Sequence, residues 1–496
     1  MLDEVRPLSD RLTARYLEEH RFIPLELRDD CVVVAAAEPL PPDVTGEVAT
    51  LFNRPVRIVP ASLAEIERAI ERTYGAGGAS VADVLDDLRE DGLELVAEAS
   101  DSPDDLADLA NQAPVIRLVN LILRDALQKR ASDVHLDAMP DALRVRYRVD
   151  GVLHDVSSSP KRYHAAVVSR IKVMANMDIA ERRLPQDGRI RLRMAEREVD
   201  LRVSTIPTVH GESVVLRILD RSSATPGLEL LGMLPEDLGR FTRLIRRPHG
   251  ILLVTGPTGS GKTTTLYTAL SQLNDATRKI ITVEDPVEYQ LRGVSQIEVH
   301  SRIGLSFAAA LRSILRQDPD IIMVGEIRDR ETAEIAVQAA LTGHLVLSTL
   351  HTNDAPTAVT RLLDMGVEDY LVASTVEGII AQRLVRRICP ECAAPYQPEG
   401  DVLARMGLPP GTRLRHGAGC RACDGTGYRG RLGIYEILIL SDQIRALVVR
   451  RTPLEEIRSV AVAEGMKTLR MDGVQKVLAG ETTLEEVLRV TAEVEE

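Results

Sequence analysis

The stretch Gly256-Pro-Thr-Gly-Ser-Gly-Lys-Thr263 fits the pattern G-x-x-x-x-G-K-[ST], which occurs once in the chain. In this pattern the glycines let backbone N–H groups turn toward phosphate oxygens, and the helix that follows favours negative charge at its N-terminus. Lys262 is expected to reach the β- and γ-phosphates, and the Thr263 hydroxyl to ligate Mg²⁺. The sequence therefore predicts a nucleoside triphosphate site made by Gly256, Pro257, Thr258, Gly259, Ser260, Gly261, Lys262, Thr263 and Thr264.

The segments around this loop alternate between short apolar runs and helical patterns. The loop follows the run 251–255 and precedes a helix with the inner face Leu266, Ala269, Leu270 and Leu273. Three similar runs follow at 280–283, 321–324 and 344–350. Between the last two, a helical pattern is formed by Ala333, Ala336, Val337, Ala340 and Leu341. Apolar strands that alternate with helices predict an α/β domain with a parallel sheet covered on both faces.

Length and charge limit the remaining interpretations. The chain has 496 residues, with Lys+Arg 61 against Asp+Glu 74, a net charge of −13. The acidic balance and the few aromatic residues (Phe 4, Tyr 10, Trp 0) argue against a nucleic-acid binder. No apolar run approaches the roughly 20 residues that cross a bilayer. The start, MLDEVRPLSDRL, lacks the apolar core of a signal peptide. We expect a cytoplasmic protein.

Composition shifts predict several domains. Residues 1–75 have the pattern of a small α/β module, with helices near 8–20 and 63–74 and a buried strand from Cys31. The segment 81–108 holds eleven Asp and Glu and one Arg, which is typical of a solvated tether. The predicted order is an amino-terminal domain 1–75, a linker 76–111, an α+β domain 112–228, the nucleotide-binding domain 229–384, a cysteine insert 385–436 and a helical domain 437–496.

The α+β domain is predicted from one helix and several strands. The helix presents the apolar face Val115, Leu118, Val119, Ile122 and Ala126. The alternating run 143–149 ends at Asp150-Gly151, a hairpin signal. Further strands are expected within 189–194, 199–203 and 214–219, so the domain should end near Asp220.

Acidic residues follow two of the predicted parallel strands. Glu284 and Glu288 follow one strand, and Glu326 follows another. Ligands meet an open α/β sheet at its strand ends, so both groups are expected to face the loop. Gly325 stands where an Asp usually precedes the Glu, so Glu326 is expected to contact Mg²⁺ through water, with Glu284 as the base; the alternative exchanges these roles.

Two histidines, His344 and His351, flank the fourth predicted strand. A buried structural histidine is the ordinary interpretation of either one. Beside the phosphate loop, they could instead sense the γ-phosphate or couple it to a neighbouring subunit.

Four of the five cysteines form two C-x-x-C pairs, Cys389/Cys392 and Cys420/Cys423. Without a signal peptide, such pairs predict a structural four-thiolate zinc site. A redox dithiol fits less well, because there are two pairs and no thioredoxin-like context. A DNA-reading finger has too few flanking basic residues. No role is predicted for the fifth, Cys31.

Four motifs together resemble the Walker A, Asp, Walker B and His boxes of secretion ATPases, the family that drives type II secretion and type IV pilus assembly. They are residues 256–263, 281–288, 320–329 and 342–351. Residues 131–135 and 184–189 are similar to the second amino-terminal domain of that family, although Leu136-Asp137 follow His135 where relatives usually carry Glu.

The resemblance implies a RecA-like P-loop ATPase domain behind α+β, PAS-like amino-terminal domains, with ATP, Mg²⁺ and Zn²⁺ as ligands. It also implies a homo-hexamer with active sites between the second amino-terminal domain and the RecA-like domain. Arg202 and Arg217 match arginines that relatives bring to the phosphates, and Arg312 and Arg316 match arginines of the catalytic domain. An arginine supplied across such an interface stabilises charge in the transition state.

The resemblance also implies partners. Pilus-assembly relatives often carry a cyclic-dinucleotide module with an R-L-G-x-x-L-type repeat, which is not found here, and residues 6–60 look more like the type II secretion form. That form docks on the cytoplasmic domain of an inner-membrane secretion protein (GspL-like) and works with a platform protein (GspF-like) at the bacterial inner membrane. A pilus assembly ATPase is the alternative. A nucleotide-binding scaffold without turnover and a DNA or RNA translocase are rivals from other classes.

Overall fold

The computed structural model describes residues 16–17, 20–28, 30–37, 39–52, 54–63, 65–66, 69, 113–194, 197–220, 227–398, 403, 406 and 408–492. The predicted tether 76–111 lies outside these residues, as do most of the two helices expected near 8–20 and 63–74. The described residues form two compact units, whose main division falls near residue 219. No helix in the described ranges is long and apolar enough to cross a membrane.

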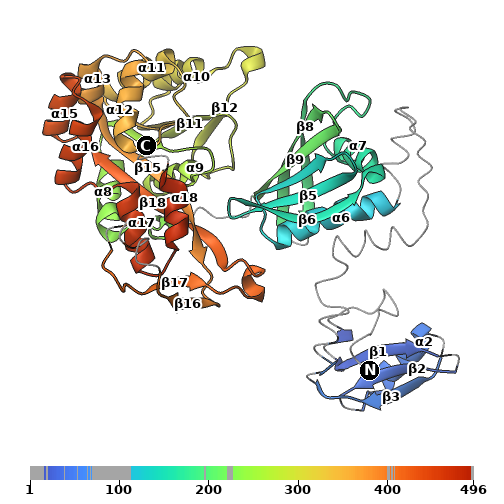
Figure 1. The fold of residues 1–496 in the computed structure, drawn as a ribbon. Coiled ribbons are helices and arrows are strands. Elements are labelled where there is room, and N and C mark those ends of the chain that lie inside the picture. The colour runs from blue at the N-terminus through green and yellow to red at the C-terminus, as the bar shows by residue number, and fades with distance from the viewer. Residues whose placement is uncertain are drawn as a thin grey trace. The chain divides into compact units, whose positions relative to one another are not determined.

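The first domain contains a three-stranded sheet and a helix (Figure 1). Its elements are β1 (Phe22–Leu27), β2 (Val32–Ala36), α2 (Pro42–Phe52) and β3 (Val56–Pro60). Strand β2 pairs antiparallel with β1 and parallel with β3, and all of its residues are buried. The strand predicted after Cys31 is therefore confirmed, whereas α2 was not predicted.

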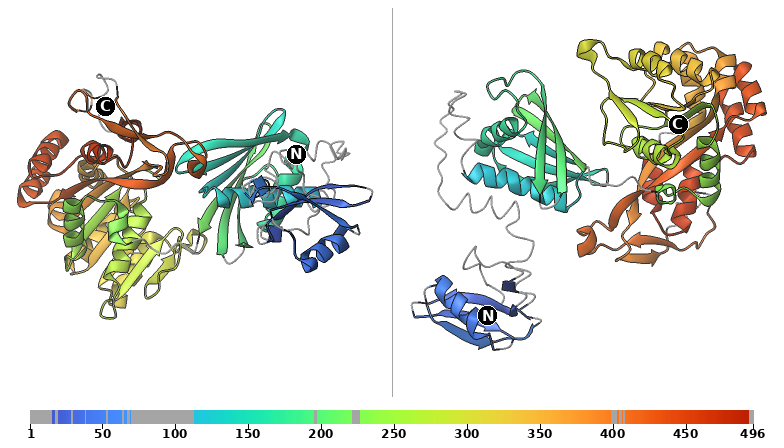
Figure 2. Two further views of the ribbon diagram at one scale, coloured as in Figure 1. Left: turned by 90° about the horizontal axis from the view of Figure 1, so that it is seen from below. Right: turned by 180° about the vertical axis from the view of Figure 1, so that it is seen from behind.

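The second domain packs helices against a six-stranded sheet of order β6-β5-β4-β9-β8-β7. Figure 2 shows it from two further sides, with both long helices on the same side of the sheet. Its elements are α6 (Ala113–Gln128), β4 (Asp133–Ala138), β5 (Ala142–Val149), β6 (Val152–Pro160), η1 (Lys161–Tyr163), α7 (His164–Met174), β7 (Gln186–Met194), β8 (Arg197–Thr208) and β9 (Gly211–Asp220).

This domain confirms the sequence pattern closely. The predicted apolar face of α6 is buried at all five positions. Asp150 and Gly151 both adopt positive φ, 49° and 88°, as a tight two-residue hairpin turn requires. Buried Tyr147 donates its hydroxyl to the Ile122 carbonyl at 2.8 Å, which ties β5 to α6. Strand β9 ends at Asp220.

The third region is built on a seven-stranded sheet of order β12-β11-β13-β14-β10-β15-β18, parallel except for the β15–β18 pair. The strands are β10 (Gly250–Thr255), β11 (Ile280–Glu284), β12 (Ser295–Glu298), β13 (Ile321–Val324), β14 (Leu345–Leu350), β15 (Val376–Ile388) and β18 (Tyr428–Ile439). Strands β16 (Ala393–Tyr396) and β17 (Leu414–Gly417) form a separate hairpin.

Helices cover both faces of this sheet, as predicted. One face packs against η2 (Leu228–Leu231), α8 (Pro235–Ile245) and α9 (Lys262–Leu273). The other packs against α10 (Phe307–Ile314), α11 (Arg330–Leu341), α12 (Ala355–Asp364) and α13 (Asp369–Thr375). Short turns η3 (Ser301–Ile303) and η4 (Leu315–Gln317) flank α10. The predicted inner face of α9 is fully buried, but Leu341 at the end of α11 is 56% exposed and does not belong to the core.

The carboxy-terminal part consists of four helices that follow β18. They are α15 (Asp442–Val449), α16 (Leu454–Ala463), α17 (Leu469–Leu478) and α18 (Leu484–Thr491), and the turn η5 (Arg421–Cys423) precedes β18. Two predicted domain boundaries, 384/385 and 436/437, fall inside β15 and β18, which are long paired strands of the main sheet. The remaining boundaries stay predictions.

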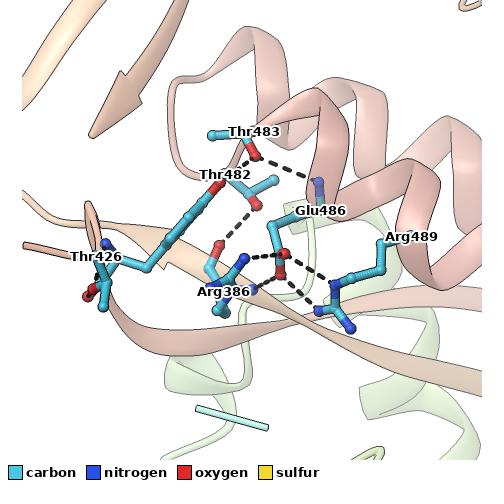
Figure 3. A network of polar contacts seen from close by, with 7 residues as sticks. Arg386, Thr426, Thr482, Thr483, Glu486 and Arg489 are labelled. Atoms are coloured by element: carbon cyan, nitrogen blue, oxygen red, sulfur yellow. Dashed lines mark hydrogen bonds and ion pairs between the residues drawn. The ribbon is translucent and has the colours of Figure 1, made fainter. Parts of the chain in front are cut away.

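A buried carboxylate fastens α18 to β15. Glu486 accepts hydrogen bonds from the backbone N–H and guanidinium of Arg386, at 2.9 and 2.7 Å, and from Arg489 (Figure 3). The Arg386 guanidinium also stacks over the Tyr428 ring, 4.0 Å from its centroid. Burial acts to raise the pKa of Glu486, but the hydrogen bonds from Arg489 and Arg386 outweigh it and lower the pKa to about 2.

Glu486→Gln is expected to lower the free energy of unfolding by about 3 kcal/mol, because the change leaves Arg386 of strand β15 without its counter-charge. Urea unfolding would measure this, with Glu485→Gln on the exposed side of α18 as the control. Because the folded-state pKa of Glu486 is depressed, its contribution is present above pH about 4.5 and is lost as pH falls toward about 2. A stability gap between the wild type and Glu486→Gln that persists unchanged at pH 2 would contradict the assignment.

Candidate functional site

The predicted phosphate loop connects β10 to α9 at the carboxyl edge of the sheet. Gly256, Gly259 and Gly261 adopt φ of 149°, 80° and 89°, which L side chains rarely adopt. A Cβ at Gly256 would also lie 2.5 Å from the Gln382 carbonyl oxygen. The loop conformation therefore requires these glycines.

The loop offers hydrogen-bond donors that an anion could use. Ser260 is buried, and its Oγ has no hydrogen-bond partner among the described residues. Thr263 and Thr264 are exposed on the first turn of α9, where helix N–H groups are free to bind. These residues fit a bound triphosphate, and the Thr263 hydroxyl fits a Mg²⁺ ligand.

Lys262 folds back over the loop. Its Nζ donates hydrogen bonds to the carbonyl oxygens of Gly256 and Pro257, at 2.7 and 3.0 Å. Burial lowers the pKa of Lys262 to about 8, and the Glu326 charge opposes this effect. The lysine is thus a cation held inside the loop, where phosphate oxygens would replace the two carbonyls.

Glu326 and His351 lie together at the same edge, since β13 and β14 are parallel neighbours. Glu326 forms an ion pair with Arg328, and its Oε2 lies 3.5 Å from His351 Nε2. Burial, and then the charge of Lys262, lower the pKa of His351, so its imidazole is neutral at pH 7. Lys262, Glu326 and His351 thus lie near enough to act on one another's charge.

Glu284 ends β11 but points into a polar cluster. The Thr282 hydroxyl donates to its Oε1 at 2.5 Å, Gln296 Nε2 donates to the same oxygen at 3.2 Å, and the Tyr267 hydroxyl donates to Oε2. The residue is 3% exposed, and this burial raises the pKa of Glu284, although the three hydrogen bonds act to lower it. Glu288 stays on the loop after β11, half-buried.

The structure separates the two histidines. His351 follows β14, whereas His344 precedes it, and a strand of this length spans roughly 20 Å. His344 Nδ1 contacts the Ala339 carbonyl at 2.9 Å and the Thr342 hydroxyl at 3.1 Å. His344 therefore lies at the amino edge, away from the phosphate loop, and sensing of the γ-phosphate within its own subunit does not fit this position.

The four predicted arginines lie on two different units. Arg202 is on β8 and Arg217 on β9, where Arg217 Nε donates to Asp133 at 3.0 Å. Arg312 pairs with Glu331 of α11, and Arg316 in η4 donates to the Arg312 carbonyl at 2.9 Å. Their roles at the nucleotide stay predictions.

Two residues of β15 were missed by sequence reasoning. Gln382 Oε1 accepts a hydrogen bond from the Thr265 hydroxyl at 2.7 Å. Arg383 is buried and donates to the Asn353 carbonyl and side chain at 3.1 Å each. Its positive charge acts to lower the pKa of Lys262. Both brace the loop from the side opposite β14. The signal was the pair Gln382-Arg383, which directly follows the apolar residues 379–381.

The four cysteines of the insert converge as predicted. Their Sγ atoms lie within 4.8 Å of one another, with pairs at 3.7, 3.8 and 3.9 Å. A tetrahedral zinc with bonds of about 2.3 Å places its sulfurs about 3.8 Å apart, so the donor set and spacing fit zinc. Backbone N–H groups of Cys420 and Gly427 donate to Cys423 Sγ at 3.2 Å, which suits a thiolate.

This fold and site define a P-loop ATPase with an appended four-cysteine element. The family model described as "Type II/IV secretion system protein" matches residues 108–489, and a second model, the MshEN domain, matches residues 2–80. The chain belongs to the Type II/IV secretion system protein family, and it is an ATPase.

Similar proteins come from several bacteria. The chain is 50% identical to the type II secretion system protein E of Xanthomonas campestris, covering 99% of this chain and 86% of that protein. It is 48% identical to the type IV pilus assembly ATPase PilB of Myxococcus xanthus, covering 96% and 85%.

Solved structures share the architecture. The pilus retraction motor PilT with bound ADP is 27% identical with a TM-score of 0.51, covering 74% of this chain and 95% of that one. The ATPase DotB of Legionella pneumophila is 21% identical with a TM-score of 0.56, covering 75% and 95%, which supports the fold alone.

Proposed function

We propose that ATP hydrolysis by this chain powers protein export through a bacterial type II secretion system by driving pseudopilus assembly. The observation that carries the proposal is the convergence of Lys262, Glu326 and His351 at the phosphate loop of a chain 50% identical to a type II secretion system protein E. The rival is a scaffold that binds nucleotide without turnover, and the presence of Glu284, Glu326 and the arginines argues against it.

The phosphate loop, the two glutamates and two of the arginines have separate proposed roles. Lys262 binds the β- and γ-phosphates, and the loop N–H groups and Ser260 hydroxyl bind the remaining oxygens. Thr263 and, through water, Glu326 hold Mg²⁺, which neutralises phosphate charge when bound. Glu284 orients and deprotonates the attacking water; the exchange of roles between Glu284 and Glu326 remains the alternative. Arg202 and Arg217, from the second domain, supply positive charge to the transferring phosphoryl group.

The insert is proposed to bind one structural Zn²⁺ through Cys389, Cys392, Cys420 and Cys423. The support is the sulfur spacing together with the small apolar content of the segment. Thiolate coordination can fold an element that has little core of its own.

We propose further that the active form is a homo-hexamer at the cytoplasmic face of the inner membrane, bound peripherally. Residues 1–75 would dock on the cytoplasmic domain of a GspL-like protein, and the ring would work with a GspF-like platform protein. Nucleic acid has no part in this proposal.

A second candidate function is type IV pilus assembly, which the 48% identity to PilB favours. Deletion of the gene in its own bacterium separates the two. Loss of extracellular enzymes with pili retained would support the secretion role, whereas loss of pili with normal export would overturn it. Re-expression of the full-length chain should restore export.

A further inference from the structure

Tyr267 occupies an unusual position between the phosphate loop and Glu284. It lies on α9, a little more than one helical turn after Lys262, and its side chain is fully buried. Its hydroxyl donates to Glu284 Oε2, and it accepts weaker hydrogen bonds from Gln296 Nε2 at 3.3 Å and from the Glu288 N–H at 3.4 Å. The ring packs edge-on against Tyr289, with centroids 4.6 Å apart.

The donors divide unequally between the two carboxylate oxygens. Thr282 and Gln296 both bind Oε1, so the Tyr267 hydroxyl is the donor that the described residues supply to Oε2. Burial, and then the Glu284 charge, raise the pKa of Tyr267, so its hydroxyl keeps its proton and remains a donor. One hydroxyl therefore fixes the direction in which the second oxygen of Glu284 points.

We propose that Tyr267 is a positioning residue for ATP hydrolysis, which holds the Glu284 carboxylate in register with the phosphate-loop helix. The proposal rests on the proposed role of Glu284 as the base. Because α9 begins at the loop and carries the hydroxyl, a change in the loop on nucleotide binding is passed through one helical turn to Glu284 Oε2.

Other charged groups surround Glu284. Glu288 lies on the loop after β11 and acts to raise its pKa. Asp285 follows Glu284 in the chain, and its Oδ2 lies 3.8 Å from Arg328 Nη1. Glu298 on β12 is the register partner of Glu284. The Tyr267 hydrogen bond acts to lower the pKa of Glu284, against the larger effect of burial. Removal of this bond is therefore expected to make Glu284 harder to ionise.

Tyr267→Phe in the full-length chain tests the proposal. We expect kcat for MgATP hydrolysis to fall about tenfold with KM within about twofold, because the change acts on the reacting group and not on nucleotide binding. A base works when ionised, so the acidic limb of the kcat profile should move to higher pH by about one unit. The matched control is Tyr435→Phe, since Tyr435 is also buried in the same core and donates to a backbone carbonyl, that of Leu231, at 2.8 Å.

The proposal is overturned if both variants lower kcat alike and leave the pH profile in place, because a structural loss would then explain the effect. The proposal is also overturned if Tyr267→Phe changes neither kcat nor the pH profile of kcat. A second measurement does not need turnover. The chain is labelled with ¹³C at its glutamate carboxyls, the pKa of Glu284 is measured by NMR titration, and Glu284→Gln assigns its signal. The pKa of Glu284 should rise in Tyr267→Phe and stay in place in Tyr435→Phe. This result would hold even if the wild type hydrolysed no ATP, which would refute only the proposed function.

Discussion

Lys262→Ala is expected to lower kcat for ATP hydrolysis by about 10²–10³-fold, the usual effect of removing one preorganised group that stabilises developing charge. The lysine is placed for this role by the loop itself, since its Nζ already lies against the carbonyls of Gly256 and Pro257. Steady-state phosphate release would measure the loss. Because the side chain also binds the ground-state phosphates, nucleotide affinity should fall as well.

The matched control is Lys279→Ala, a lysine at the amino edge of the sheet whose Nζ bonds the Gln317 carbonyl. This variant should keep wild-type turnover, because the opposite sheet edge takes no part in phosphate binding. Full activity in Lys262→Ala would refute the site, whatever the behaviour of the control.

Cys420→Ser is expected to abolish zinc binding and to unfold the insert. Elemental analysis should find about one zinc per wild-type chain and almost none in the variant, and limited proteolysis should cut between Cys389 and Tyr428. The effect is large because four-thiolate coordination contributes about 10–16 kcal/mol to the folding of small zinc elements. The buried apolar side chains described in this insert, such as Leu414, are too few to replace it.

Cys31→Ser provides the comparison, since Cys31 is buried in the first domain and lies outside the cluster. The Cys31→Ser variant should retain about one zinc per chain, and its insert should remain resistant to protease. A wild-type chain that contains no zinc after purification without chelator would contradict the metal assignment.

The sheet could be predicted from sequence where its strands are continuous and apolar. Strands β10, β11, β13 and β14 are buried along their whole length, and the sequence shows this directly. Strand β12 could not be found in this way, because an edge strand of sequence SQIE is short and half-exposed. Strands β15 and β18 carry polar residues that serve the loop and α18, so their pattern resembled the margin of an insert.

The site was predictable in part. The phosphate loop depends on local residues, so the motif was sufficient. The position of His344 could also have been predicted, because a residue before a parallel strand lies at the opposite edge from a residue after it. The burial of Glu284 could not, since it depends on Tyr267 and Gln296, which only the folded chain brings together.

Strand β15 connects the phosphate loop directly to the cysteine cluster. It runs for 13 residues, with Gln382 and Arg383 against the phosphate loop near its middle and Cys389 directly after its end. Strand β10 pairs with it only as far as Ala381, whereas β18 pairs with it from Gly378 to Ile388, with a bulge between Arg386 and Ile388. The segment between Gln382 and Cys389 is therefore held by the β18 ladder and spans about 20 Å, so that a tilt of about 5° at the pocket would move Cys389 by about 2 Å.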